Sequence, residues 1–200
     1  MELTAAEPRR GRLTQLFLDG ERAARVDTET FLRSGLRPGD QVTGERLCQL
    51  LQDSDANRAK EKALYLLGYR SHSKKELAEK IARAGVGRQA AQEAADRMEE
   101  LGLIDDGAYA RQYAKELFTR KRYGAMRVRQ ELLRKGIDGE LIEEVLAGYG
   151  DEDAAQGNIQ AVLEKKYPGW EEDDRQHRRA FAALRRMGYS FEDIRQAMGF

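Results

Sequence analysis

Leu132-Leu133-Arg134-Lys135-Gly136-Ile137 has two counterparts elsewhere in the chain. They are Ile81-Ala82-Arg83-Ala84-Gly85-Val86 and Leu184-Arg185-Arg186-Met187-Gly188-Tyr189, so the three glycines stand 51 and 52 residues apart. Apolar residues recur at the same offsets from each glycine: four positions before it, and one, six and nine positions after it. A long period of this kind is typical of stacked supersecondary units, each too small to bury an apolar face alone. The repeat predicts an elongated, curved array with a long outer surface, and not a compact enzyme with one deep cleft.

The composition describes a highly charged chain. Its 200 residues are 40% hydrophobic and 35% charged, with a mean hydropathy of −0.75. No stretch approaches the ~18 apolar residues of a membrane span, and charged residues interrupt the N-terminus where a signal peptide would be apolar. The single cysteine, Cys48, excludes an internal disulfide and lies in an apolar helical pattern, which predicts a small core residue. These features favour a cytoplasmic protein that makes no contact with a membrane.

The N-terminal region has the pattern of a β-hairpin followed by a helix. Residues 12–26 contain two strand-like runs joined by Asp19-Gly20, a dipeptide that favours a type I′ turn. A short helix follows, capped by Asp27 or Thr28 and ended by Gly35. A lone hairpin is marginally stable in water, so this one must dock on a neighbour. We expect a small module over residues 10–50.

The rest of the chain reads as helix. An apolar stripe begins at Leu47, Leu50 and Leu51, and the apolar residues from Ala63 to Leu67 continue a second helix to about Gly68. Further helices are expected to start at side-chain caps and to end at glycines. The predicted caps are Ser73, Asp105, Asp138 and Ser190. The fold class is therefore mostly α, with three tandem three-helix repeats over residues 51–104, 105–150 and 151–200.

The sequence lacks the motifs of common catalytic sites. No glycine cluster forms a phosphate loop, and His72 and His177 lie far apart in polar surroundings that predict surface positions. The most specific enzyme hypothesis is that the adjacent Asp105 and Asp106 act as paired catalytic carboxylates. Adjacent side chains at a helix start would point in different directions, however, and a capping role explains both residues. We therefore expect neither an enzyme nor a cofactor or metal requirement.

Charge is strongly segregated along the chain. Nine bases and two acids lie between Gly107 and Gly136, whereas twelve acids and two bases lie between Asp138 and Asp174; the chain is basic again from Arg175. A solvated helix surface is the ordinary explanation of such a run. Like charges on one helix face are nevertheless destabilising, and a negatively charged partner would relieve them. Phosphates and an acidic protein groove both fit. The aromatic residues are expected to have structural roles. Tyr109, Tyr113 and Phe118 follow the helical spacing of core residues, and Trp170 is expected to pack a bend between helices.

An ordered set of short motifs resembles the RecX family of recombination regulators. The densest part begins with Gly102-Leu103-Ile104-Asp105-Asp106 and continues through Tyr109-Ala110, Tyr113, Gly124, Arg127-Val128, Glu131-Leu132 and Lys135-Gly136-Ile137. Tyr69-Arg70-Ser71 and the capping stretch from Ser73 to Leu77 are similar to the family's first repeat, and Leu18-Asp19-Gly20-Glu21 to an N-terminal extension of some members. The resemblance covers residues 12–200 and is loosest in the third repeat, where Glu171–Asp174 departs from the pattern.

The resemblance implies a function. Proteins of this family bind RecA recombinase, lodge along the groove of the RecA–DNA filament, and restrain its ATPase, strand-exchange and co-protease activities. We expect a monomer that binds this filament, with the DNA phosphate backbone as a second partner; the alternative is a stand-alone, non-specific nucleic-acid binder. The residues expected to make electrostatic contacts are Arg70, Lys74, Lys75, Arg111, Lys115, Arg120, Lys121, Arg122, Arg127, Arg134 and Lys135.

Overall fold

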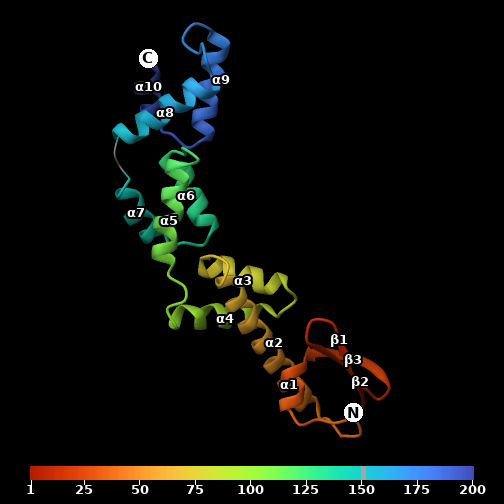
Figure 1. Ribbon diagram of the computed structural model, residues 1–200. Coiled ribbons are helices and arrows are strands. Elements are labelled where there is room, and N and C mark those ends of the chain that lie inside the picture. Colours follow the sequence, from red (N-terminus) through yellow and green to blue (C-terminus); the bar gives the residue numbers. More distant parts are fainter. Residues whose placement is uncertain (150–151) are drawn as a thin grey trace. The chain divides into compact units, whose positions relative to one another are not determined.

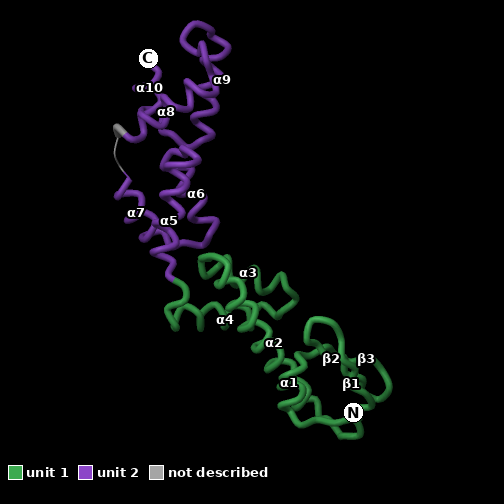
Figure 2. Tube along the Cα trace, in the orientation of Figure 1, with its two compact units in different colours: residues 1–104 green, residues 105–200 purple. Residues whose placement is uncertain are grey.

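The computed structural model describes residues 1–149 and 152–200, drawn as a ribbon in Figure 1. The chain forms two compact units, residues 1–104 and residues 105–200, which Figure 2 distinguishes by colour. Each unit has its own buried cores, and each is described by itself. The expected boundary between the second and third repeats, at residues 150 and 151, lies outside the described residues.

The first unit begins with a three-stranded antiparallel sheet in the order β1-β2-β3. The strands β2 (Leu13–Leu18) and β3 (Glu21–Asp27) form the predicted hairpin. Both turn residues have positive φ, 50° at Asp19 and 84° at Gly20, as a type I′ turn requires. The third strand, β1 (Leu3–Arg9), was not predicted, because alanines and Pro8 give it little strand propensity.

Two helices follow the sheet. The short α1 (Thr28–Arg33) is capped by the side chain of Asp27, which is one of the two residues predicted for this role. The next helix, α2 (Gly44–Leu67), is continuous over 24 residues and ends at Gly68, the predicted end. Its polar middle contains no proline or glycine that could break it. The sheet, α1 and the first part of α2 enclose one core. Cys48 is exposed, which corrects its predicted burial, since α2 turns its Leu50 face to that core.

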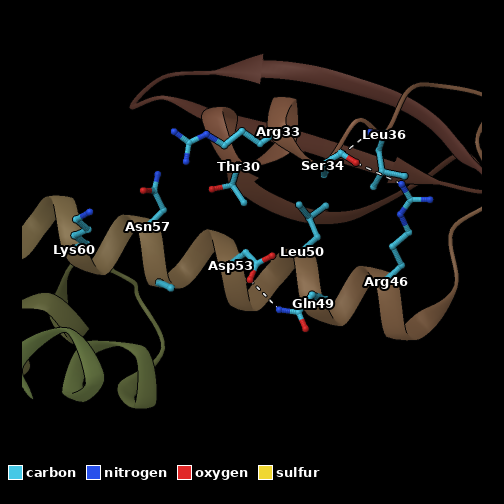
Figure 3. Close-up of a pocket in the computed structure, with 11 residues that line it drawn as sticks. Thr30, Arg33, Ser34, Leu36, Arg46, Gln49, Leu50, Asp53, Asn57 and Lys60 are labelled. Atoms are coloured by element: carbon cyan, nitrogen blue, oxygen red, sulfur yellow. Dashed lines mark hydrogen bonds between the residues drawn. The ribbon is translucent and has the colours of Figure 1, made fainter. Parts of the chain in front are cut away.

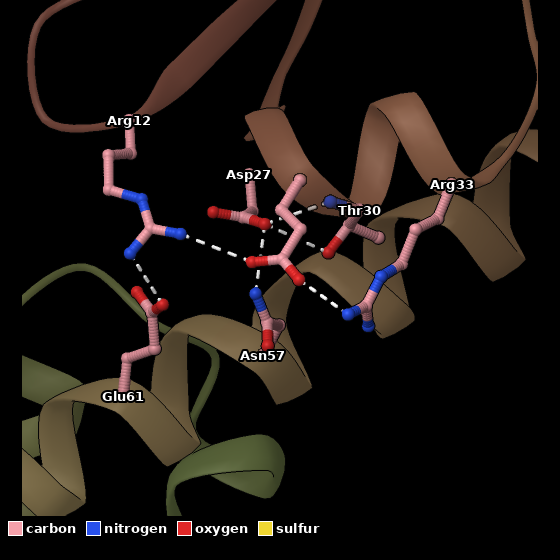
Figure 4. A network of polar contacts seen from close by, with 7 residues as sticks. Arg12, Asp27, Thr30, Arg33, Asn57 and Glu61 are labelled. Atoms are coloured by element: carbon pink, nitrogen blue, oxygen red, sulfur yellow. Dashed lines mark hydrogen bonds and ion pairs between the residues drawn. The ribbon is translucent and has the colours of Figure 1, made fainter.

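A polar network ties the sheet to α2, as Figure 4 shows. The buried Asp27 accepts hydrogen bonds from the Thr30 amide and from Asn57 Nδ2, each at 2.9 Å. Its own amide donates to Ser54 Oγ on α2 at 2.7 Å. Nearer the surface, Arg12 pairs with Glu61 of α2. Burial raises the pKa of the Asp27 carboxyl, but these hydrogen bonds and the Arg12 charge outweigh it, and the net pKa lies below its usual value.

The first three-helix repeat completes this unit. It combines the second half of α2 with α3 (Lys74–Arg83) and α4 (Arg88–Glu100). Its core includes Leu77 and Ile81 of α3, and α2 contributes to this core and to that of the sheet. Ser73 caps α3 as predicted. His72 is only 3% exposed, which corrects the expectation of a surface histidine: the α2–α3 connection folds it inward.

The second unit contains two further repeats. The first of them consists of α5 (Asp106–Thr119), α6 (Ala125–Arg134) and α7 (Gly139–Ala147). The other consists of α8 (Glu152–Lys166), α9 (Asp174–Arg186) and α10 (Phe191–Met198). Each has its own buried core. Three tandem three-helix repeats are therefore confirmed.

Local signals at the helix ends are confirmed as well. The repeat glycines Gly85, Gly136 and Gly188 have φ values of 82°, 79° and 92°, in the left-handed region that ends helices. The predicted caps Asp105, Asp138 and Ser190 each accept a hydrogen bond from the first turn of their helix.

The aromatic side chains predicted as core do pack there. Tyr109 is buried, and Tyr113 and Phe118 pack beside it. Trp170 packs on the core of the third repeat, close to the half-buried His177. Among the residues that the structure describes, no helix is both long enough and apolar enough to traverse a bilayer.

Candidate interaction surface

The basic segment identified in the sequence occupies α5, α6 and the loop between them. The loop is held in place by the third repeat. The Tyr189 hydroxyl donates to the Arg122 carbonyl at 2.8 Å, and the Gly124 amide donates to the Met187 carbonyl at 2.9 Å. Burial raises the pKa of Tyr189 to about 12, so its hydroxyl keeps its proton and its donor role. Arg122 adopts a positive φ of 53°, which turns the chain sharply into α6. The loop therefore presents its cations from a fixed backbone.

Most arginines of the segment are ion-paired within the second unit. Glu131 pairs with both Arg127 at 2.7 Å and Arg134 at 3.1 Å. Farther along α5, Arg120 pairs with Glu116 at 3.1 Å. Glu131 is the most protected of these groups, with 17% of its side chain exposed.

The acidic helix α7 supplies further counter-charges. Arg129 pairs with Glu143 at 2.6 Å, and Arg111 lies 3.9 Å from Glu144. The segment ending at Gly136 contains few acidic residues in sequence, but α7 brings carboxylates close to its arginines in the folded protein. Exposed pairs of this kind contribute about 0–1 kcal/mol each, so a polyanionic partner can displace them.

Within the basic segment, three candidate cations make no ion pair with any other described residue: Lys115, Lys121 and Arg122. Lys115 is exposed on α5, and Lys121 is exposed in the loop beside the half-buried Arg122. We call these three residues the basic corner. Two other cations lie over rings: Arg127 is 5.7 Å from the Tyr123 ring centroid, and Lys135 is 5.6 Å from that of Tyr113. The basic corner can thus meet a partner without breaking an ion pair to a described residue.

The remaining candidates lie in the first unit. Arg70 pairs with Glu76 at 2.8 Å. Lys74 pairs with Asp96 and with Glu99, each at 2.7 Å, and both carboxylates raise the pKa of its ammonium group above the usual value. Lys75 is exposed. Arg70 and Lys74 therefore have structural partners of their own, and Lys74 links α3 to α4.

Two cavities are further candidate sites. One, of about 580 Å³, lies between α1 and α2 and is lined by Arg33, Arg46, Asp53 and Lys60 (Figure 3). The other, of about 600 Å³, lies beside the loop that carries Arg122 and is lined by Phe118, Tyr149 and Asn158. Neither lining contains a cysteine or a histidine, and residues 1–149 and 152–200 contain no cluster of His, Cys, Asp and Glu suited to a metal. Asp105 caps α5, which is the role predicted for it as the alternative to catalysis.

Sequence reasoning did not include the arginines of α9 among its candidates. All five are exposed: Arg175, Arg178, Arg179, Arg185 and Arg186. The signal that could have found them is helical periodicity, because they lie opposite the apolar residues of that helix.

These features define a class: proteins of tandem three-helix repeats with charged outer surfaces. Family models of the first, second and third three-helix domains of RecX match residues 59–98, 105–146 and 152–198. A curated Regulatory protein RecX from Chlorobium phaeobacteroides is 32% identical over 149 residues, which cover 74% of this chain and 96% of that protein. The chain therefore belongs to the RecX family.

Further comparisons agree with this assignment. A Regulatory protein RecX from Caldanaerobacter subterraneus subsp. tengcongensis is 29% identical over 183 residues, covering 92% of this chain and 90% of that protein. A crystal structure of regulatory protein RecX superposes with a TM-score of 0.67 at 18% identity and covers 99% of this chain and 98% of that one. RecX from Lactobacillus salivarius gives a TM-score of 0.62 at 22% identity, covering 72% and 95%. The two structures bear on the fold alone.

Proposed function

We propose that this protein binds RecA and the RecA–DNA filament in the cytoplasm and modulates, mainly by inhibition, its ATPase, strand-exchange and co-protease activities. The family assignment carries the proposal. A regulator of this kind acts by occupying a surface and needs no catalytic group or cofactor. Three tandem repeats offer several separated contact surfaces, and many weak contacts made together can give firm binding to a polymer. We propose that it acts as a monomer.

The basic corner is the surface that we assign to the filament in the second repeat. Lys115 and Lys121 are exposed and have no ion pair among the described residues, so their binding breaks no ion pair within that part of the chain. Arg122 follows Lys121 in the loop, on a backbone held by the Tyr189 hydroxyl. Charges of this kind act chiefly on the association rate and on selectivity, and salt weakens them.

A second candidate function is stand-alone binding of nucleic acid. Lys115 and Lys121 favour it equally well, since phosphates and acidic side chains attract the same cations. The two functions differ in stoichiometry. A regulator of the filament inhibits at amounts far below those that saturate the DNA, whereas a DNA binder inhibits only by removing free DNA.

The DNA-dependent ATPase of RecA, titrated with this protein at two DNA concentrations, distinguishes them. We expect the half-inhibitory concentration to follow the amount of RecA and to stay constant when DNA is added in excess. A half-inhibitory concentration that rises in proportion to the DNA would instead establish the second function. No inhibition at any ratio would overturn both.

Charge reversal tests the assigned surface. Lys115→Glu/Lys121→Glu should raise the half-inhibitory concentration by about fivefold or more at low salt, and by less as salt increases. The matched control is Arg22→Glu/Arg25→Glu, which changes the net charge equally on exposed positions of β3. Equal effects of the two double variants would remove the basic corner from the mechanism.

A further inference from the structure

Helix α9 (Asp174–Arg186) is divided sharply into an apolar and a cationic face. Ala180, Ala183 and Leu184 are buried against the rest of the third repeat. At about 100° per residue, all five arginines of the helix fall on the opposite arc, about 120° wide. We call this arc the arginine face. It carries one row of Arg175, Arg179 and Arg186 and a second row of Arg178 and Arg185.

The arginine face carries little else. Ala182 is the other residue on the arc, and Asp174, in the first turn, is the one acid of the helix. None of the five arginines makes an ion pair with another described residue; Arg185 donates a hydrogen bond to the Tyr189 carbonyl at 3.1 Å. In this respect α9 is unlike α6, where all three arginines are paired with carboxylates. Five uncompensated like charges on one face destabilise a helix unless a partner neutralises them.

Exposed aromatic rings border the arginine face. Phe181 lies one helical turn from both Arg178 and Arg185, and its ring centroid is 6.0 Å from those of Phe191 and Phe200. Phe191 is 53% exposed and Phe200 is 50% exposed. Single exposed apolar side chains are ordinary on a protein surface, but a contiguous group of them marks a contact site.

We propose that the arginine face and the adjoining rings of α9 and α10 bind single-stranded DNA. Guanidinium groups pair with phosphates in a bidentate manner, and the rows extend for about 16 Å, the length of several nucleotides. Proteins that bind single-stranded nucleic acid combine a row of cations, which contact the phosphates, with aromatic rings, on which the bases stack.

A protein partner fits this surface less well than a nucleic acid does. It would have to place an acidic group opposite each of five arginines at matched positions, whereas a phosphate backbone supplies negative charge at every step. The DNA surface lies on a different repeat from the basic corner. It is independent of the proposed function, because binding to DNA can be measured without any recombinase.

Fluorescence anisotropy of a labelled thymidine oligonucleotide of about 20 residues, titrated with the full chain over a range of salt concentrations, tests the arginine face. We expect binding with a steep salt dependence. Arg175→Glu/Arg179→Glu/Arg186→Glu should weaken binding about tenfold or more and reduce the slope of log K against log salt by about 2, since each single-strand phosphate contact contributes about 0.7.

The charge-matched control is Arg10→Glu/Arg22→Glu/Arg25→Glu, in the β1–β2 turn and on β3, which should change the affinity less than about threefold. The glutamine variants at the three α9 positions serve as a second set, with the melting temperature measured for each protein. Any of three results would overturn the proposal. The unaltered chain does not bind the oligonucleotide, the two glutamate triple variants lose affinity equally, or the folded α9 variants keep the same slope of log K against log salt. Unchanged DNA binding together with lost RecA binding would overturn it in favour of a protein contact.

Phe191→Ala tests the contribution of the rings. It should weaken single-strand binding about fivefold or more and leave duplex binding within about twofold, because duplex bases are already stacked. Leu133→Ala, at a side chain with 50% exposure on α6, is the matched control and should change neither. Equal affinity for duplex and single strand in the unaltered protein, with no effect of Phe191→Ala, would overturn the assignment to single-stranded DNA.

Discussion

Gly124, at the start of α6, and Gly188, at the end of α9, lie in direct backbone contact. The Gly124 amide donates to the carbonyl just before Gly188, and the Met126 amide donates to the Gly188 carbonyl at 3.2 Å. Free amides at the N-terminus of one helix thus satisfy free carbonyls at the C-terminus of another. The contact joins the second and third repeats within one unit and fixes the loop that carries Arg122.

A side chain at Gly124 should disrupt this junction. A Cβ atom there would lie 2.5 Å from the Tyr189 nitrogen, and backbone cannot move aside as a flexible side chain can. Gly124→Ala should lower the free energy of unfolding by about 1–3 kcal/mol, measured by urea denaturation. Gly139→Ala is the control, because a Cβ atom at Gly139 meets nothing within 4 Å. A similar loss in both variants would mean that the close approach does not govern stability.

The repeat glycine Gly136 tests the left-handed helix end. Its φ of 79° suits glycine, and a β-branched side chain is strained there. Gly136→Val should destabilise the protein by about 1 kcal/mol or more, seen as a lower melting temperature. Gly136→Asn should lose less, because asparagine tolerates this conformation. An unaltered melting temperature for the valine variant would contradict this role.

Asp27 should make the protein sensitive to acid. Its folded-state pKa lies below the ordinary 3.8, so its stabilising contribution is complete above that value and is lost as the pH falls through the folded-state pKa. Asp27→Asn should cost about 1–3 kcal/mol of unfolding free energy near neutral pH. The difference from the unaltered protein should shrink at about pH 3, in urea denaturation at matched pH values. A difference that stays constant with pH would exclude the ionised carboxylate as the cause.

His72 should act in a higher pH range. Its Nδ1 atom lies 3.3 Å from a Glu76 oxygen, and burial outweighs that carboxylate and lowers the pKa of the imidazole below 6.5. The unfolded chain therefore binds a proton that the folded chain does not, and stability falls as the pH drops from above 6.5 toward the folded-state pKa. His72→Gln cannot take up that proton. It should lose less stability between about pH 7.5 and about pH 5.5, and an identical pH profile would contradict this account.

Short-range features were predictable because their physical causes are local. A cap needs one side chain and the amides two or three residues ahead, as at Asp105 and Ser190. The hairpin turn needs two adjacent residues with positive φ, which Asp19-Gly20 supplies. Apolar spacing then assigned Tyr109 to a core, and the glycine period revealed the repeats.

The site was less predictable, because charge pairing depends on distance in space. Arg129 is 14 residues from Glu143 in sequence, yet the two are hydrogen-bonded. The sequence therefore located the basic segment but could not separate Arg129, which is paired, from Lys121, which has no ion pair among the described residues. The sequence also predicted an exposed His72 and a buried Cys48, and both predictions were wrong. The polarity of neighbouring residues in sequence does not determine which side chains are buried in the fold.

The sequence by itself determined the helices, their ends, the hairpin and the threefold repeat, since these depend on hydrogen bonds and apolar periodicity within a few residues. Only the tertiary structure decided which arginines have carboxylate partners, that β1 joins the sheet, and that Gly124 meets Gly188. Each of these contacts joins elements that the chain brings together only when its apolar faces are buried, so no local pattern encodes them.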